Sequence, residues 1–239
     1  AVAFVIVEIR HQTPLVRLGI LRNWHLVHAN LSGAIMAGGY FSFQFLATLY
    51  LQDSLGWSPM AMALGFLPAG LLVIASSTRI DRVLARVSTQ ALITIGLGSF
   101  LVAYALFLRV DPGLGYAALL LPTMVLLGVG FATAFPSINV QATAGVADHE
   151  QGLASGLVNT SVQIGGAVVL AVVSVILANA ATADGPAQPD HLIPGMLSGL
   201  QVIVALTAVG VVASLVTLLV KRPEPVPAVE SIDEVELAA

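Results

Sequence analysis

The sequence predicts an all-α membrane protein with six transmembrane helices. Hydrophobic residues make up 57% of its 239 residues and charged residues only 9%, against roughly 25% charged residues in an ordinary soluble domain. The charged residues are also absent from six long apolar stretches, each long enough to cross a bilayer, which takes about 20 residues. A soluble domain of this size cannot shield six such stretches from water, so a large buried helical core is the weaker alternative.

The six predicted spans follow one another along most of the chain. They cover residues 26–51, 58–78, 87–108, 114–140, 152–179 and 194–220, and none contains Asp, Glu, Lys or Arg. Because a charge at the centre of a membrane helix costs about 2.5–3.5 kcal/mol on insertion scales, hydrocarbon enforces this exclusion. Residues 1–7 are also apolar and predict the end of a preceding span. Since the chain begins with Ala1 inside this segment, we expect it to be a fragment of a longer protein.

The distribution of positive charge predicts the orientation. The linker 8–25, the loop 79–86 and the tail 221–239 hold eight of the nine Lys and Arg residues, and the loops between them on the other side hold only Arg109. The positive-inside rule therefore places the linker, the loops 79–86 and 141–151, and the C-terminus in the cytoplasm. The tail is interrupted by proline and rich in acid, which predicts a disordered end.

Small residues and prolines within the spans predict close helix packing and bends. Gly152 and Gly156 form a pair at the spacing that lets membrane helices approach closely. Pro68 and Pro136 each remove a backbone hydrogen bond inside a span and are expected to bend their helices. Such bends suit a protein that moves between states, but they also occur in static bundles.

Neutral polar and aromatic side chains form stripes at helical spacing on three spans, and the stripe on the first span includes Asn30, Phe41 and Gln44. A buried amide needs a hydrogen-bond partner or water, so these stripes are expected to face other helices or a wet cavity rather than lipid. One interpretation is a substrate cavity. The other is hydrogen bonding between helices, worth about 0.6 kcal/mol per bond. The candidate substrate-binding residues are Phe41, Gln44, Asn139, Asn159 and Gln163.

Other classes of function have little support. The chain has no cysteine and no metalloprotease or phosphate-binding loop motif, so we expect no enzyme activity, no cofactor and no metal site. The low charge gives no basic surface for nucleic acid. Because the spans hold no carboxylate, a proton-coupling carboxylate is expected outside this chain.

Four segments match a known family of transporters. They are the first loop from Glu8 to Asn23, the turn from Tyr50 to Pro59 with Gly65 and Pro68 after it, the basic loop from Arg79 to Arg86, and the run from Gly128 to Pro136 continued by Glu150 to Thr160 and Gln163 to Ala167. On these residues the chain resembles the C-terminal half of a major facilitator superfamily transporter, and more narrowly the fourteen-span drug:proton antiporter family. It departs from the family at Ser77 and Leu84, where glycines usually flank the Asp–Arg pair, and at Val162, where the family often has Arg.

The resemblance implies a fold and a mechanism. The spans would form two inverted three-helix repeats, 26–108 and 114–220, and substrate would bind near mid-membrane between this half and a missing N-terminal half. The implied function is export of lipophilic or cationic drugs by proton antiport with alternating access, in the inner membrane of a bacterium.

The resemblance also implies a role for the basic loop. Asp81, Arg82 and Arg86 would form a cytoplasmic latch that pairs with the other half, whereas the simpler interpretation is that the arginines only set topology. The implied partners are the missing half, the lipid bilayer, a small lipophilic substrate and the proton. Two other functions stay open: a permease for one metabolite or siderophore, and a transporter-like membrane scaffold or sensor.

Overall fold

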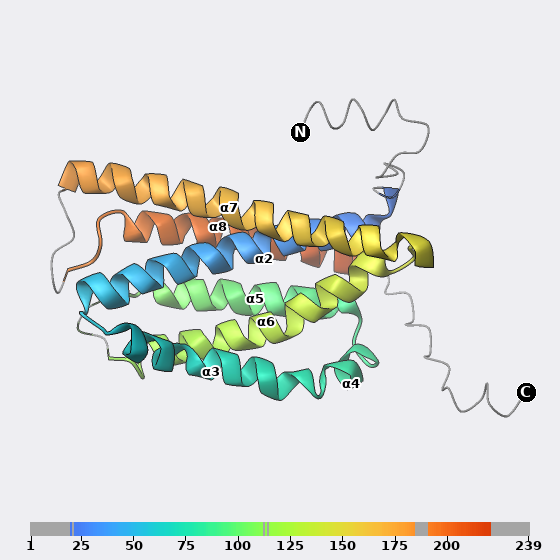
Figure 1. The fold of residues 1–239 in the computed structure, drawn as a ribbon, viewed down its shortest axis with the longest axis horizontal. Helices are drawn as coiled ribbons and strands as arrows, with labels where there is room; N and C mark the ends of the chain where they lie inside the picture. Colours follow the sequence, from blue (N-terminus) through green and yellow to red (C-terminus); the bar gives the residue numbers. More distant parts are fainter. Residues whose placement is uncertain (1–19, 21, 112, 114, 185–190, 221–239) are drawn as a thin grey trace, which may run out of the picture.

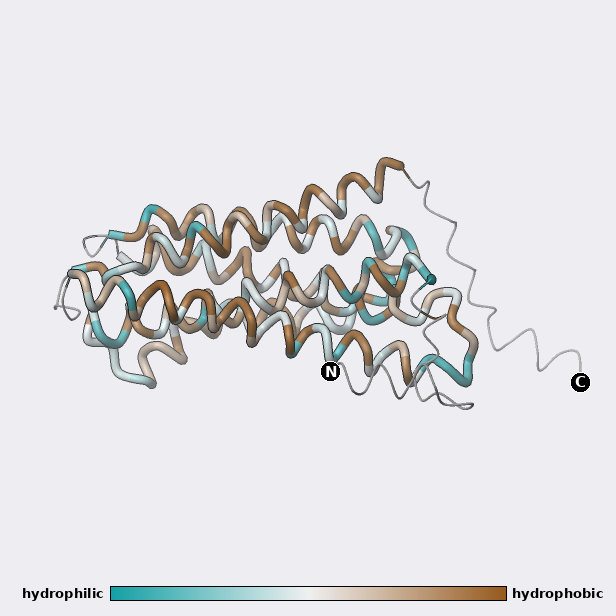
Figure 2. Tube along the Cα trace, turned by 90° about the horizontal axis from the view of Figure 1, so that it is seen from above, coloured by the Kyte–Doolittle hydropathy of each residue, from teal (hydrophilic) through white to brown (hydrophobic). Residues whose placement is uncertain are grey.

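The computed structural model describes residues 20, 22–111, 113, 115–184 and 191–220. Six long helices run side by side along one axis (Figure 1), and apolar residues dominate their length while polar residues gather toward the ends (Figure 2). They are α2 (Trp24–Leu49), α3 (Pro59–Ser77), α5 (Thr89–Phe107), α6 (Leu120–Thr143), α7 (Gln151–Asp184) and α8 (Met196–Val220). All six are long and apolar enough to cross a membrane, which confirms the predicted all-α fold with six spans.

Short elements join the long helices at both ends of the bundle. The π-helix η2 (Tyr50–Ser54) extends α2, the short helix α4 (Ile80–Leu84) follows α3, and the 3-10 helix η3 (Asp148–Glu150) precedes α7. The predicted start of the fourth span at residue 114 is wrong. The carbonyl of Gly115 accepts from the backbone amides of Ala118 and Leu119 in turns, so α6 begins only at Leu120.

Two predicted segments lie outside the described residues. These are the end of a preceding span at 1–7 and the tail 221–239; the linker 8–25 is described only from residue 20, without residue 21.

Side-chain caps fix where three of the spans begin. The side chains of Asn23, Ser58 and Ser88 each accept a hydrogen bond from a backbone amide in the first turn of α2, α3 and α5, which satisfies donors that a helix start leaves open. Before α3, Gly56 adopts a φ of 63°, a conformation that glycine takes at little cost. Pro59 then occupies the start of α3, where its missing N–H costs nothing.

Small residues bring the helices into close contact. At the crossing of α2 and α7, a side chain on Gly165 would collide with the backbone of Ala34. At the crossing of α5 and α6, a Cβ on Gly96 would lie 2.6 Å from the Cβ of Ala134. Since lipid supplies no hydrophobic force between helices, this close backbone approach is a main source of their association.

The first three long helices pack mainly against the last three rather than against one another. Helix α2 packs chiefly on α7 and α8, helix α6 packs chiefly on α5 and α3, and α5 packs on α8. Exchanging α2 with α6, α3 with α7 and α5 with α8 maps these principal contacts onto one another, a relation expected of two inverted repeats, whereas the lesser contacts of α7 with α6 and α8 and of α2 with α5 have no equal counterpart. The two three-helix repeats stay a prediction, and α2 and α6 are neighbours in the middle of the bundle.

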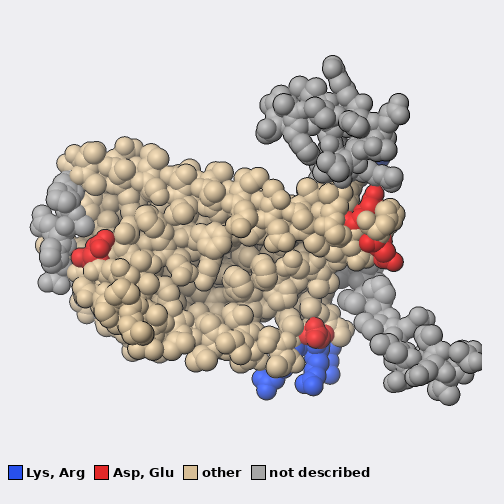
Figure 3. All heavy atoms as spheres, in the orientation of Figure 1, with Lys and Arg blue, Asp and Glu red and all other residues tan. Residues whose placement is uncertain are grey.

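Charged residues lie at the two ends of the bundle. On the face drawn in Figure 3, the middle is free of charge. At one end, which we call the arginine end, α2 begins, α6 ends and α4 lies (Figure 1). Arg22 precedes α2, and Arg79, Arg82 and Arg86 lie in α4 or next to it in the sequence. These four arginines of the described residues therefore share one end of the bundle, and the predicted orientation of that end toward the cytoplasm stays a prediction.

Candidate functional site

A pocket of about 380 Å³ opens between α2, α3 and α6 near the middle of the bundle. This volume lies in the range of small-molecule pockets, roughly 300–1,000 Å³. Its walls are apolar except for the hydroxyl of Tyr40 and the amide of Gln44, both on α2. The lining residues are Tyr40, Phe43, Gln44, Phe66, Ala69, Gly70, Val73, Ile74, Met124, Leu127, Gly128 and Phe131.

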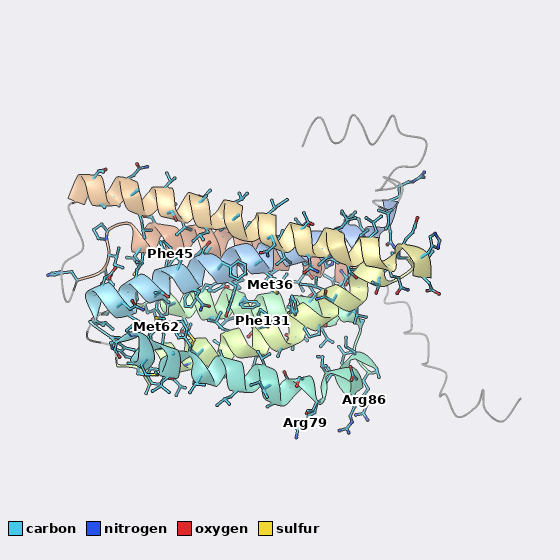
Figure 4. The ribbon with its side chains drawn as sticks, in the orientation of Figure 1. Met36, Phe45, Met62, Arg79, Arg86 and Phe131 are labelled. Atoms are coloured by element: carbon cyan, nitrogen blue, oxygen red, sulfur yellow. The ribbon has the colours of Figure 1, made fainter. Side chains whose placement is uncertain are left out.

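Aromatic rings form one wall of this pocket. The ring of Tyr40 lies 5.6 Å from that of Phe131 and 6.3 Å from that of Phe100, and Phe131 stacks on Phe135 at 5.1 Å. Figure 4 shows Phe131 and Met36 in the centre of the bundle, where α2 and α6 lie side by side. Such rings offer flat apolar surface to a ligand and attract cations over their faces.

Of the five predicted substrate-binding residues, the structure brings only Gln44 to this pocket. Phe41 is 42% exposed, and its ring lies against Gly166 of α7. Asn139 donates to the carbonyl of Phe135 in its own helix at 2.8 Å. Two further residues, Asn159 and Gln163, lie exposed on α7. A cavity lined by all five residues therefore stays a prediction, and its remaining walls would have to come from a part of the protein outside the described residues.

Tyr40 is the polar residue of the pocket lining that sequence reasoning missed. It directly precedes Phe41 in the sequence but is not a member of the predicted stripe of the first span, and one more aromatic residue is ordinary for a membrane span. Only the approach of α3 and α6 makes Tyr40 part of a pocket, and no pattern within α2 reports that approach.

The second interpretation of the polar stripes, hydrogen bonding between helices, is observed at Asn30. Its Oδ1 accepts from Ser161 Oγ of α7 at 2.6 Å, and its Nδ2 donates to the carbonyl of Leu26 at 2.8 Å. This amide therefore serves helix association.

The predicted latch residues lie at the arginine end. Asp81 and Arg82 belong to α4 and Arg86 follows it, and all three are exposed. Arg79 and Arg86 point away from the helices in Figure 4. Within the described residues these side chains form no ion pair, so their charges are open to a partner.

The predicted bend and packing positions differ in their surroundings. Pro68 and Pro136 lie inside α3 and α6, and α6 changes direction in its second half, which contains Pro136 (Figure 1). A Cβ on Gly152 or Gly156 would meet nothing within 4 Å. Their packing role therefore stays a prediction for a partner other than the described residues.

Comparison with known families explains the arrangement of helices. A family model described as "Major Facilitator Superfamily" matches residues 4–170, which is more than half of the chain. The chain belongs to the Major Facilitator Superfamily. It is an integral membrane protein of a family of transporters rather than enzymes, with its six apolar helices as the membrane-spanning part.

Several known proteins are similar to the chain over most of its length. The puromycin resistance protein pur8 of Streptomyces alboniger is 33% identical over 88% of this chain and 43% of its own length. The lincomycin resistance protein of Streptomyces lincolnensis is 30% identical over 72% of this chain and 36% of its own. The tetracenomycin C resistance and export protein of Streptomyces glaucescens is 27% identical over 74% and 32%. The chain thus spans less than half the length of each of these relatives.

Proposed function

We propose that this chain is the C-terminal half of a drug exporter of the drug:proton antiporter type. The observation that carries the proposal is the mid-bundle pocket, whose walls are aromatic and apolar with one amide and one phenol. Relatives named for resistance to puromycin and lincomycin, and for resistance to and export of tetracenomycin C, support the same class of substrate.

The pocket chemistry favours lipophilic compounds of varied shape. Phe131 and Tyr40 supply ring faces to aromatic or cationic parts of a ligand. Gln44 carries both a donor and an acceptor, so it serves polar groups of either kind. Because the pocket lining contains no carboxylate, the charge of a cationic drug and the coupled proton are assigned to the N-terminal half.

The exporter works by alternating access between the two halves. This half would lie against the missing one across the face that α2, α3, α6 and α7 present in Figure 1, with the substrate between them. The arginine end would face the cytoplasm of a bacterium, by the positive-inside rule. At this end the charged side chains would form ion pairs with the other half and so stabilise one of the two conformations of the exporter. These side chains are Asp81, Arg82 and Arg86.

The test uses the full-length transporter in proteoliposomes with an imposed proton gradient. We expect uptake of several chemically unrelated lipophilic drugs, each inhibiting the others, and loss of uptake when the gradient is collapsed. Counterflow that only one compound supports would replace this proposal by a permease for one metabolite. No gradient-dependent movement of any compound would favour the scaffold or sensor.

A further inference from the structure

Gly70 of α3 leaves a gap in one wall of the pocket. Phe66, Gly70 and Ile74 recur at every fourth position, so they follow one another along one face of the helix. All three line the pocket. The large side chains of Phe66 and Ile74 therefore lie one turn before and one turn after a position that has no side chain. We call the space between them the notch.

The notch has room for a side chain. A Cβ on Gly70 would meet nothing within 4 Å among the described residues. Gly70 is also exposed, in a helix whose only buried residue is Gly65. Close packing within the described part of the chain therefore does not require glycine at this position.

The backbone at Gly70 does not require glycine either. Among the described glycines, a positive φ occurs only at Gly56, Gly145 and Gly195, and Gly70 lies inside the helix α3. Glycine is a poor helix former, because its backbone has the most conformational freedom to lose. The role of Gly70 is therefore expected in the space that it leaves open.

Gly128 of α6, which also lines the pocket, has the opposite surroundings. A Cβ on Gly128 would lie 2.9 Å from the carbonyl oxygen of Ala69 and 3.0 Å from the Cβ of Leu72. Gly128 therefore lets α6 pack directly on α3, at the residue before Gly70. One pocket glycine brings the two helices together, and the other leaves space within the pocket wall.

We propose that the notch receives one ring of a bulky lipophilic compound, so that Gly70 determines the largest drug that the pocket accepts. The rings of Tyr40 and Phe131 line the same pocket. A compound with several rings can therefore place one ring in the notch and another against these side chains, and each ring gains apolar burial and ring contacts. The inference deepens the proposed function and rests on it, because it concerns the drugs that this pocket binds.

The experiment compares the binding of two cations of different size to the full-length transporter in lipid nanodiscs. Phenyltrimethylammonium carries one ring and tetraphenylphosphonium carries four. Dissociation constants are measured by equilibrium dialysis, with empty nanodiscs as the correction for binding to lipid. The proteins compared are the parent, Gly70→Ala and Gly70→Leu.

A leucine in the notch should discriminate between the two cations. Because it occupies the space of one ring, Gly70→Leu should weaken the binding of tetraphenylphosphonium about ten-fold or more, as overpacking does. The smaller cation does not need the notch, so its dissociation constant should change by less than about three-fold. Gly70→Ala should have a smaller effect than Gly70→Leu, because a methyl group fills less of the notch.

Gly98 on α5 supplies the matched control. A Cβ on Gly98 would also meet nothing within 4 Å, but Gly98 does not line the pocket, so Gly98→Leu should bind both cations as the parent does. If Gly70→Leu does not insert, Gly70→Cys in a background without other cysteines gives the same test after modification with N-ethylmaleimide, which fills the notch in the folded protein. Tetraphenylphosphonium should also slow this modification.

Four results would overturn the proposal. The parent may fail to bind tetraphenylphosphonium, or Gly70→Leu may change the binding of the two cations equally. The thiol of Gly70→Cys may be unreactive, which would mean that the other half of the transporter fills the notch. Finally, Gly70→Ala may already abolish binding, which would assign Gly70 to the flexibility of α3 or to close contact with the other half.

Transport of drugs by the same proteins in proteoliposomes distinguishes the two proposals. Size-dependent binding at Gly70 without gradient-driven transport rejects the proposed function and keeps the notch as a binding position. Gradient-driven transport of several drugs, with both cations affected equally by Gly70→Leu, rejects the notch and keeps the proposed function.

Discussion

Gln44 is the side chain that gives the pocket its adaptable polarity. Replacing it with Ala removes one neutral hydrogen bond to polar drugs, worth about 0.5–1.5 kcal/mol, or roughly a 2- to 10-fold loss of apparent affinity. Apolar drugs should be affected less, so the order of substrate preference should change. Competition between polar and apolar drugs in the transport assay measures this change.

Gln163→Ala is the matched comparison for Gln44→Ala, since Gln163 is exposed on α7 and away from the pocket. A change in preference for both variants would mean that the cavity extends to α7, as the sequence predicted. If Gln44→Ala lowers only the amount of inserted protein, Gln44 is a packing residue and the assignment fails.

Asp81 tests the latch. The exposed carboxylate forms no ion pair within the described part of the chain, so Asp81→Asn should leave insertion and expression nearly unchanged. A charge-assisted contact with the other half is worth about 1.5–3 kcal/mol, so transport should fall roughly ten-fold or more. Initial rates of export, normalised to inserted protein, give the answer, with Asp53→Asn at the opposite end as the control. Unchanged export would leave the basic loop with a topological role alone.

The candidate site was predictable only for features that depend on the residue spacing within a single helix. Helical spacing identified the stripe of α2 that contains Asn30 and Gln44: Gln44 lines the pocket, and Asn30 bonds to Ser161 of α7. Spacing does not report which helix arrives opposite, so Asn159 was expected beside Gln44 although it lies exposed on α7. The amide nitrogen of Gln141 on α6 lies 2.9 Å from a ring nitrogen of His28 on α2, although the two residues are 113 positions apart in the sequence. No pattern within either helix predicts this contact.

Glycine positions decide the fit of one helix against another. Gly96 on α5 leaves no room for a side chain, since a Cβ would lie 2.8 Å from the backbone nitrogen of Ala134. Gly96→Ala should therefore force α5 from α6 and cost about 1–3 kcal/mol of stability. The midpoint of thermal unfolding in detergent, followed by size-exclusion chromatography, should fall.

Gly98, two residues further along α5, is the matched control. A Cβ there would meet nothing within 4 Å, so Gly98→Ala should be neutral or stabilising by up to about 1 kcal/mol, because alanine favours the helix. Equal loss of stability in both variants would contradict the packing argument and point to helix flexibility instead.

The spans themselves were predictable because each is a long apolar stretch without charged residues, which the sequence alone reveals. The predicted ends agree with the structure within a few residues for most helices, and caps such as Ser58 and Ser88 explain their starts. The fourth span failed because residues 114–119 are apolar enough for a membrane but Gly115 begins a series of turns. Hydropathy identifies apolar segments but does not indicate whether their backbone is helical.

The whole bundle predicts which positions share a side of the membrane. The structure places Arg86 at the arginine end and Asp53 at the opposite end. Cysteines introduced singly at these two exposed positions should react with a membrane-impermeant maleimide from opposite sides, with Arg86→Cys reached only after the cytoplasmic side is opened. Labelling of both positions from the same side would refute the arrangement of the spans.

The bond between Asn30 and Ser161 also constrains biosynthesis. Its two residues are 131 positions apart, so α2 enters the lipid long before the ribosome has made the helix that completes it. Until then the Asn30 oxygen has no hydroxyl from α7 to bind, and an unsatisfied amide in hydrocarbon is costly. We expect nascent chains truncated after α6 to stay next to the insertase and chains extended through α7 to leave it, which site-specific photocrosslinking at α2 would reveal.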